Sequence, residues 1–322
     1  MSTPVTPQAA YPDPLDAIVL AGTDDNPRRM ILGQNKAFLE MAGQTLVERV
    51  VDALLEVDTV GQVFVVGPLE RLRAVLGERS ERVTLVAQSG QMLANAWEAI
   101  HAIEARWKSS GRGADPQRPI LFLSCDLPLI SPQAVADFIA RCAHEDSQAQ
   151  TGYSMLCGVA EEASLRQYYP ENGKPGIRRP YVNMAECRVR LANIYVGRPR
   201  TLTNQAFLQV GFEHRKAEKW KNVLYLIWRF LSEHGGLQAA WLAARMQATL
   251  LVSRNRDSWL YQRLRKGNTT RRTEAVCSRT LGGAVRMVIT PYGGLSLDAD
   301  NEDDFRVLNT RFEEWISVPP AE

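Results

Sequence analysis

The stretch DAIVLAG, at residues 16–22, is apolar after its first residue and ends in a glycine. Such a run is typical of a strand that is buried on both faces of a parallel sheet. A polar loop follows at residues 23–35, and residues 36–55 then carry apolar side chains at the spacing of a helix. The order of strand, polar loop and helix is that of a βαβ unit, and it decides the class of fold.

The same alternation continues along the chain. Strand patterns occur at residues 60–66, 83–87 and 120–124, with helical patterns between them at residues 69–76 and 91–107. Strands that alternate with helices form right-handed βαβ units and a mostly parallel sheet. We therefore predict an α/β protein of the Rossmann-like type, in which about the first 150 residues form a doubly wound, mostly parallel sheet.

Beyond this region the pattern changes. Strand patterns at residues 153–159 and 189–196 enclose a loop rich in glycine, proline and lysine, and helical segments follow at residues 216–233 and 237–252. A strand pattern at residues 285–290 indicates a return to the sheet. We divide the chain into a flexible leader at residues 1–14, a core at 15–200, a basic helical insertion at 201–280 and a C-terminal return to the core at 281–322.

The composition excludes several classes of protein. With 322 residues, 45% of them hydrophobic, and a net charge of +2, the chain has the profile of a globular protein and not of a disordered one. The apolar run at residues 223–228 is too short to cross a bilayer, and the first residues lack the pattern of a signal peptide. Five cysteines without paired spacing argue against disulfides and structural zinc. These features predict a cytoplasmic protein.

Positive charge is concentrated at residues 211–280, which contain 14 Lys and Arg against 5 Asp and Glu. An anionic partner is expected there. The apolar stripe from Trp220 to Leu231 has two interpretations: packing between helices, or contact with a phosphorylated, lipid-like molecule or a membrane surface. Nucleic acid is not expected, because the basic residues belong to no recognised binding module. The sequence does not determine the oligomeric state.

The end of the first strand has the features of a phosphate-binding loop. In an open parallel sheet, ligands bind at the carboxyl ends of the strands. Ala21 and Gly22 have little or no side chain, so backbone N–H groups in this loop can approach phosphate oxygens. The positive charge that a triphosphate requires would come from Arg28, Arg29 and Lys36.

Two aspartates are candidate ligands of a metal ion. Asp126 follows the apolar strand at residues 120–124, and a carboxylate at a strand end is a natural ligand of Mg²⁺, which commonly takes one or two carboxylates together with substrate phosphates. The alternative role for Asp126 is to cap a helix. Asp298 follows a glycine-rich turn and would bring a second carboxylate to the same ion. The alternative for Asp298 is a solvated acidic loop.

Three stretches resemble a known family: LAGTDDNPRRM at residues 20–30, LFLSCDLPLISPQAV at 121–135 and LSLDADNEDDF at 295–305. They are similar to the MobA-like NTP transferases, a superfamily that holds molybdenum-cofactor guanylyltransferases and sugar- and alditol-phosphate nucleotidylyltransferases. The resemblance covers residues 15–145 well and residues 281–310 moderately. It implies a core of the nucleotide-diphospho-sugar transferase type.

The resemblance also implies roles for individual residues. The signature loop of the family matches Leu20, Ala21, Gly22, Arg29 and Lys36. The segment that lines the base matches Gln88, Gly90 and Asn95. The metal aspartate matches Asp126, and the late acidic motif matches Asp298. Acceptor contacts are implied for Lys174 and Asn193, and Arg178 and Arg179 would bind the acceptor's phosphate. The alternative for Lys174 is an ordinary solvated lysine.

The implied function is a Mg²⁺-dependent nucleotidylyltransferase, in which a phosphorylated acceptor attacks the α-phosphorus of an NTP and pyrophosphate leaves. The attacking phosphate is already ionised, so no general base is required, and Arg29 and Lys36 would hold and neutralise the triphosphate. Two alternatives remain open. A nucleotide-sugar-dependent glycosyltransferase would use Asp298 and Asp300 as a DxD metal motif. A catalytically weak, nucleotide-binding regulatory protein on the same fold would suit the loop at residues 23–33, which differs from the signature loop of the family.

Overall fold

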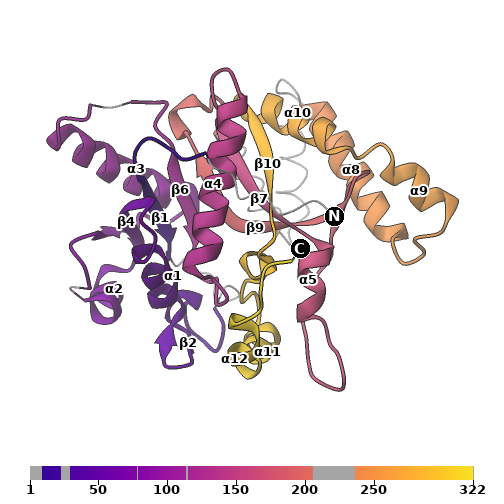
Figure 1. Ribbon diagram of the computed structural model, residues 1–322, viewed down its shortest axis with the longest axis horizontal. Helices are drawn as coiled ribbons and strands as arrows, with labels where there is room; N and C mark the ends of the chain where they lie inside the picture. The colour runs from indigo at the N-terminus through magenta and orange to yellow at the C-terminus, as the bar shows by residue number, and fades with distance from the viewer. Residues whose placement is uncertain (1–8, 23–29, 78, 114, 206–235, 322) are drawn as a thin grey trace.

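A single large sheet organises the protein (Figure 1). The computed structural model describes residues 9–22, 30–77, 79–113, 115–205 and 236–321. Within them the strand order is β10-β7-β9-β6-β1-β4-β5, and β8 pairs with β9 at the side of this path. The strands are β1 (Leu15–Leu20), β4 (Val60–Gly67), β5 (Val83–Ala87), β6 (Ile120–Ser124), β7 (Met155–Glu161), β8 (Val182–Asn183), β9 (Arg188–Gly197) and β10 (Val285–Thr290).

The sheet is mostly parallel, which confirms the predicted class of fold. β1 pairs in parallel with β4 and with β6, β4 with β5, and β7 with β10. β9 is antiparallel to both of its neighbours, β6 and β7. Because β9 runs the other way, its first residues lie at the edge where β1, β6, β7 and β10 end. Side chains from the start of β9 therefore reach the same crevice as the loops that follow those parallel strands.

Helices cover both faces of the sheet. On one face, α1 (Leu46–Leu55) and α4 (Pro132–Gln148) bury apolar side chains against β1, β4 and β6. On the other face, α3 (Met92–Ser109) packs Ile100 and Ile103 against Ile18 and Phe64. Each such side chain contributes about 1.5–3 kcal/mol when fully buried. These two layers hold the strand ends in fixed positions.

The predicted helix at residues 36–55 is wrong in its first half. Lys36–Phe38 form a single 3-10 turn (η2), and β2 (Glu40–Met41) pairs with β3 (Gln44–Thr45) as a hairpin. The hairpin turn places Ala42 at φ 49° and Gly43 at φ +77°, a left-handed conformation that interrupts a helix. α1 begins only after Thr45, which forms a capping box with Glu48.

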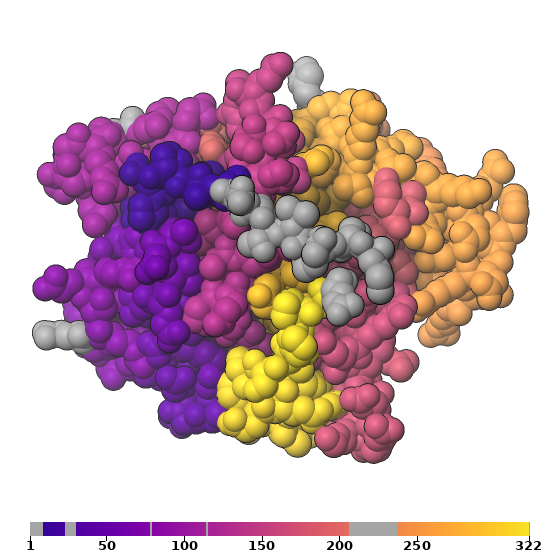
Figure 2. Space-filling view, in the orientation of Figure 1, coloured from indigo at the N-terminus to yellow at the C-terminus, as the bar shows by residue number. Residues whose placement is uncertain are grey.

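The C-terminal residues return to the sheet and pack against its N-terminal half. β10 adds to the edge beside β7. Phe312 and Trp315 share an apolar cluster with Ile31, Met41 and residues near α5 (Glu162–Leu165). Figure 2 shows this segment, in yellow, between the purple N-terminal half and the rose residues of the middle of the chain. The helices of this part are α11 (Glu302–Thr310) and α12 (Phe312–Ile316), which follow the short turn η5 (Gly293–Ser296).

In the described part of the region between the core and the C-terminal return lie α8 (Gly236–Val252), α9 (Trp259–Arg265) and α10 (Thr270–Leu281). The helix predicted at residues 237–252 corresponds to α8. The helix predicted at residues 216–233 and its stripe from Trp220 to Leu231 lie outside the described residues, so the basic helical insertion and the division into domains stay predictions. None of the described helices is both long and apolar enough to traverse a bilayer.

Candidate active site

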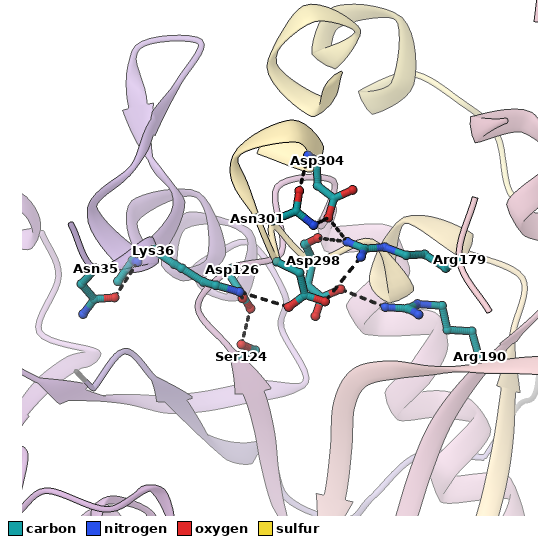
Figure 3. Close-up of polar contacts among 11 residues, drawn as sticks. Asn35, Lys36, Ser124, Asp126, Arg179, Arg190, Asp298, Asn301 and Asp304 are labelled. Carbon is teal, nitrogen blue, oxygen red and sulfur yellow. Dashed lines mark hydrogen bonds and ion pairs between the residues drawn. The ribbon is translucent and has the colours of Figure 1, made fainter. Parts of the chain in front are cut away.

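Lys36 lies at the carboxyl edge of the sheet, beside the end of β6. Its Nζ atom is 3.2 Å from Asp126 Oδ2 and 3.1 Å from Asp300 Oδ1 (Figure 3). The preceding residue explains this placement. The side chain of Asn35 accepts a hydrogen bond from Ala37 N at 3.0 Å and donates one to Ala21 O at 2.9 Å. Asn35 thus ties the turn that carries Lys36 to the end of β1.

Three carboxylates form a cluster around this amine. One oxygen from each of Asp126, Asp298 and Asp300 lies within 4.8 Å of the others. Asp126 follows β6 and accepts a hydrogen bond from Ser124 Oγ, whereas Asp298 and Asp300 follow η5. Ala299 N donates to Asp126 O at 3.4 Å, which holds the two segments side by side. The two predicted metal aspartates, Asp126 and Asp298, therefore lie together, and Asp300 joins them.

Two arginines brace the cluster from the side of β9. Arg190 Nη2 is 3.1 Å from Asp298 Oδ1, and its Nε donates to Ser296 O at 2.9 Å. Arg179 Nη2 donates to Asp298 O at 3.2 Å and also contacts Asp304 (Figure 3). Both guanidinium groups are largely buried. They fix the backbone and side chain of Asp298 and leave the cluster facing Lys36.

The pKa values reflect this crowding. Burial raises the pKa of Asp298, and the neighbouring carboxylates of Asp126 and Asp300 raise it further, against Arg190 and Lys36. Burial alone would lower the pKa of Lys36, but the same carboxylates raise it above the usual lysine range. The amine of Lys36 is therefore protonated and positively charged, as the neutralisation of a polyphosphate requires.

The cluster has the chemistry of a site for a hard divalent cation. Its donors are carboxylate oxygens, which Mg²⁺ prefers, and they come from two segments that hydrogen bonds hold in register. Three carboxylates this close repel one another. Lys36, Arg190 and Arg179, whose Nη1 is 3.7 Å from Asp300 Oδ2, offset the repulsion in part, because Arg179 is shared with the further carboxylate of Asp304. A divalent cation held by Asp126, Asp298 and Asp300 would offset the remainder.

The residues predicted to bind the nucleotide converge on the same crevice. Leu20, Gly22, Gly90 and Asn95 line one cavity together with Lys36 and the three carboxylates, and its volume is about 350 Å³. Gly22 lies against Asn95, because a Cβ atom there would be 2.5 Å from Asn95 Nδ2. Asn95 Oδ1 accepts hydrogen bonds from Ser89 N at 2.7 Å and Gly90 N at 3.2 Å.

The ends of β1 and β5 thus meet through Asn95, at the beginning of α3. Gln88 reaches the same place, since its Oε1 would be 3.4 Å from a Cβ atom on Gly22. Ala21 is buried and donates to Val66 O at 2.8 Å, which fixes the start of the loop. The other predicted phosphate ligands, Arg28 and Arg29, lie outside the described residues, and the next residue, Met30, lines the cavity.

The residues with implied acceptor contacts separate. Asn193, on β9, lines the cavity near the carboxylates. Lys174 instead forms an exposed ion pair with Glu314 at 3.1 Å, and Arg178 stacks over the ring of Tyr169 at 4.9 Å. Neither is among the described residues that line the cavity. In the structure, Lys174 therefore forms an ion pair at the surface, as exposed lysines commonly do.

Reasoning from the sequence missed Arg190 as part of the site. Its signal is weak, because alternation in RVRLANIYV indicates only that residues 188 and 190 share a face. Asp300 was considered only as half of a DxD motif. Its spacing of two from Asp298 was the available signal.

An acidic cluster at the carboxyl edge of a mostly parallel sheet, beside a glycine-bounded cavity, defines a nucleotide-binding α/β transferase. The chain belongs to the family of the MobA-like NTP transferase domain, whose model matches residues 17–203. It is accordingly a nucleotidyltransferase. No curated protein matches this chain.

The chain is similar to several solved structures. A hypothetical transferase from Thermus thermophilus superposes with a TM-score of 0.59 at 19% identity, covering 90% of this chain and 98% of that one. A 4-diphosphocytidyl-2C-methyl-D-erythritol synthase from Anaerococcus prevotii gives a TM-score of 0.43 at 11% identity, over 94% and 96% of the two chains. A CMP:2-keto-3-deoxy-manno-octonic acid synthetase complexed with CTP gives 0.45 at 14% identity, over 93% and 99%.

Proposed function

We propose that the protein is a Mg²⁺-dependent nucleotidylyltransferase that transfers NMP from an NTP to a phosphorylated acceptor and releases pyrophosphate. One observation carries the proposal: Lys36 and three carboxylates meet in the lining of a cavity that Gly22 and Asn95 also line. This arrangement joins a site for a base, a site for phosphates and a site for a cation.

The reaction needs positioning more than proton transfer. An acceptor phosphate oxygen forms a bond to the α-phosphorus while the bond from the α-phosphorus to its bridging oxygen breaks, and pyrophosphate leaves with the electron pair. The attacking oxygen is already ionised, so no proton has to be removed. Lys36 neutralises charge that grows on the leaving phosphates, and Arg29 is proposed to assist it.

A bound Mg²⁺ would neutralise negative charge on the phosphate groups of the NTP and of the acceptor. Asp126 and Asp298 are the proposed ligands, with Asp300 as a third. Arg190 orients Asp298, as its ion pair of 3.1 Å supports. Ser124 orients Asp126 through its hydroxyl hydrogen bond.

The assignment is tested by measuring pyrophosphate release from the four NTPs with a panel of phosphorylated sugars, polyols and alkyl alcohols. Asp126→Ala should abolish release with every NTP, and Asp303→Ala, on an exposed side chain of α11, should leave it unchanged. Undiminished release in Asp126→Ala would contradict the proposal. Calorimetry that shows no NTP affinity with Mg²⁺ present would favour the regulatory alternative.

A glycosyltransferase is the second candidate function. The observation that favours it is that both aspartates of the Asp298-x-Asp300 motif belong to the cluster. Preferential binding of a UDP-sugar over every free NTP would reverse the ranking.

We also propose a cytoplasmic location, which the five unpaired cysteines support.

A contact with anionic membranes is proposed for the surface of α8 and α9. Leu237, Trp241 and Leu251 are exposed along one side of α8, and Trp259 of α9 is 71% exposed. Arg245 lies over the Trp241 ring and Arg263 over the Trp259 ring. Exposed tryptophans with adjacent arginines suit the interface of an anionic bilayer.

A further inference from the structure

The cavity that begins at the carboxylate cluster continues along one face of the sheet. β6 and β9 form its floor, and their register sets Phe122 opposite Tyr195. Ser124 lies two residues beyond Phe122, and Asn193 lies two residues before Tyr195, so all four side chains share one face. All four line the cavity. Away from the carboxylates, the floor therefore changes from polar to aromatic.

The rest of this part of the cavity is also apolar. Trp97 and Ile100 of α3 and Leu202, beyond β9, line its walls. Met155 lies opposite Gly197 and continues the floor past Tyr195. A Cβ atom at Gly197 would make an ordinary van der Waals contact, 3.4 Å from the ring of Phe122, so a larger side chain there would extend over this floor.

Among the described residues that line the cavity, charged groups stand only at the two limits of this apolar part. Lys36 and the three aspartates lie at one limit, where the part lined by Gly22 and Asn95 begins, and Arg198 lies at the other. The charge of Arg198 is already neutralised, because it forms an ion pair with Asp146 at 2.9 Å. Its guanidinium also donates to Tyr153 O and Gln117 O. The described residues of the apolar stretch therefore offer no free charge to a polar sugar or polyol.

The nucleotide has its own place on the other side of the cluster. Gly22 and Asn95 lie at the ends of β1 and β5, whereas the apolar floor belongs to β6, β9 and β7 on the opposite side of β1. The carboxylates stand between the two parts. A molecule on the apolar side can therefore present a phosphate to the cluster without displacing the base.

We infer that the acceptor is a phosphomonoester of an aliphatic alcohol, with its phosphate facing the proposed cation site of the carboxylate cluster and its hydrocarbon chain over Phe122 and Tyr195. The inference rests on the proposed function and names its substrate class. The acceptor's phosphate oxygen forms the new bond to the α-phosphorus, the bond to the β-phosphate bridging oxygen breaks, and pyrophosphate departs with the electron pair. The product is a nucleoside diphosphate esterified to the apolar alcohol.

The test is a chain-length series of butyl, hexyl, octyl and decyl phosphate, with glucose 1-phosphate and inorganic phosphate as polar comparisons. Binding is measured by calorimetry below the micelle concentration. Burial of each methylene should tighten binding about three- to fourfold until the cavity is filled. Gly197→Leu, which fills the cavity, and Tyr195→Ser, which makes its floor polar, should both flatten the series. Ile289→Ser, on an exposed residue of β10, is the control.

Each result decides the inference. A rising series that both variants flatten, with melting temperatures close to wild type, supports it. Binding that does not depend on chain length, or a dependence that both folded variants retain, overturns it. Pyrophosphate release is measured separately with the same compounds. Chain-length-dependent binding without release from any NTP would leave the phosphomonoester site standing and refute nucleotidyl transfer, whereas release with polar acceptors alone would do the opposite.

Discussion

The ammonium group of Lys36 lies 3.2 Å from the carboxylate of Asp126, although 90 positions separate the two residues in the chain. The same amine is 3.1 Å from Asp300, on a segment 264 positions further along. Three distant parts of the sequence thus meet at one nitrogen atom. The pair lies where the ends of β1 and β6 adjoin, so its geometry depends on the parallel pairing of those strands.

The charge of Lys36 should govern turnover. Lys36→Met keeps the apolar stem and removes the charge that neutralises the leaving phosphates. We expect kcat for pyrophosphate release to fall about 10²- to 10³-fold, as on loss of one preorganised electrostatic contact. Lys36→Arg should recover part of the rate. A loss below fivefold in Lys36→Met would show that the amine serves packing or folding alone.

Mg²⁺ should stabilise the folded protein through the carboxylate cluster. At ten times its dissociation constant, the cation should add about 1.4 kcal/mol to the free energy of unfolding. Thermal melting with MgCl₂, against KCl at equal ionic strength, measures the effect. Asp300→Asn should reduce it, and Asp303→Asn, whose side chain is 89% exposed, should not. Equal melting temperatures in the two salts would argue against a cation site.

Arg190 should contribute to stability because its removal leaves Asp298 buried without a partner. Both side chains are about one-tenth exposed, at 11% and 8%. Loss of one member of such a pair costs about 3–5 kcal/mol, so Arg190→Gln should lower the free energy of urea unfolding by that order. Arg73→Gln, in an exposed pair with Glu70, should change it by less than about 1 kcal/mol. Similar values for the two variants would contradict the bracing role.

Gly22 should be needed for nucleotide binding. An alanine Cβ at this position would lie 2.5 Å from Asn95 Nδ2 and would displace the side chain that holds Ser89 N and Gly90 N. We expect Gly22→Ala to weaken binding of the preferred NTP about tenfold or more, measured by calorimetry with Mg²⁺ present. Asn95→Ala should lose affinity too, and the double variant should lose less than the sum of the two. Strict additivity would mean that the contact is irrelevant to the base site.

The α8 and α9 surface should retain the protein on anionic vesicles. In flotation with phosphatidylserine vesicles at low salt, the wild type should float with the lipid. The double variant Trp241→Ser/Trp259→Ser should stay in the bottom fraction. Ile289→Ser provides an exposed apolar control from the sheet edge. Wild-type protein that stays in the bottom fraction at low salt would contradict the proposed membrane contact.

The fold and half of the site followed from local patterns. Buried apolar strands and the rule that ligands bind at their carboxyl ends led to Ala21, Gly22 and Asp126, because those arguments need only neighbouring residues. The placement of Arg190 depends on the antiparallel direction of β9, which is a matter of strand pairing and leaves no trace in the local sequence.

The error at residues 36–45 and the surface ion pair of Lys174 have the same physical origin. The helical spacing of residues 36–55 concealed a hairpin, because a left-handed turn at Ala42 and Gly43 does not disturb the hydrophobic pattern. Lys174 belongs to a polar loop whose direction is set by a partner far away in sequence, Glu314. In both places tertiary contacts decide among conformations that the local sequence permits equally.

The late arrival of Asp298 and Asp300 has a consequence for biosynthesis. The matched family segment ends at residue 203, but two of the three clustered carboxylates come almost a hundred residues later. A nascent chain that has completed the matched segment still lacks two of the three carboxylates that surround Lys36. Premature termination before η5 would thus leave a polypeptide without most of the proposed cation site.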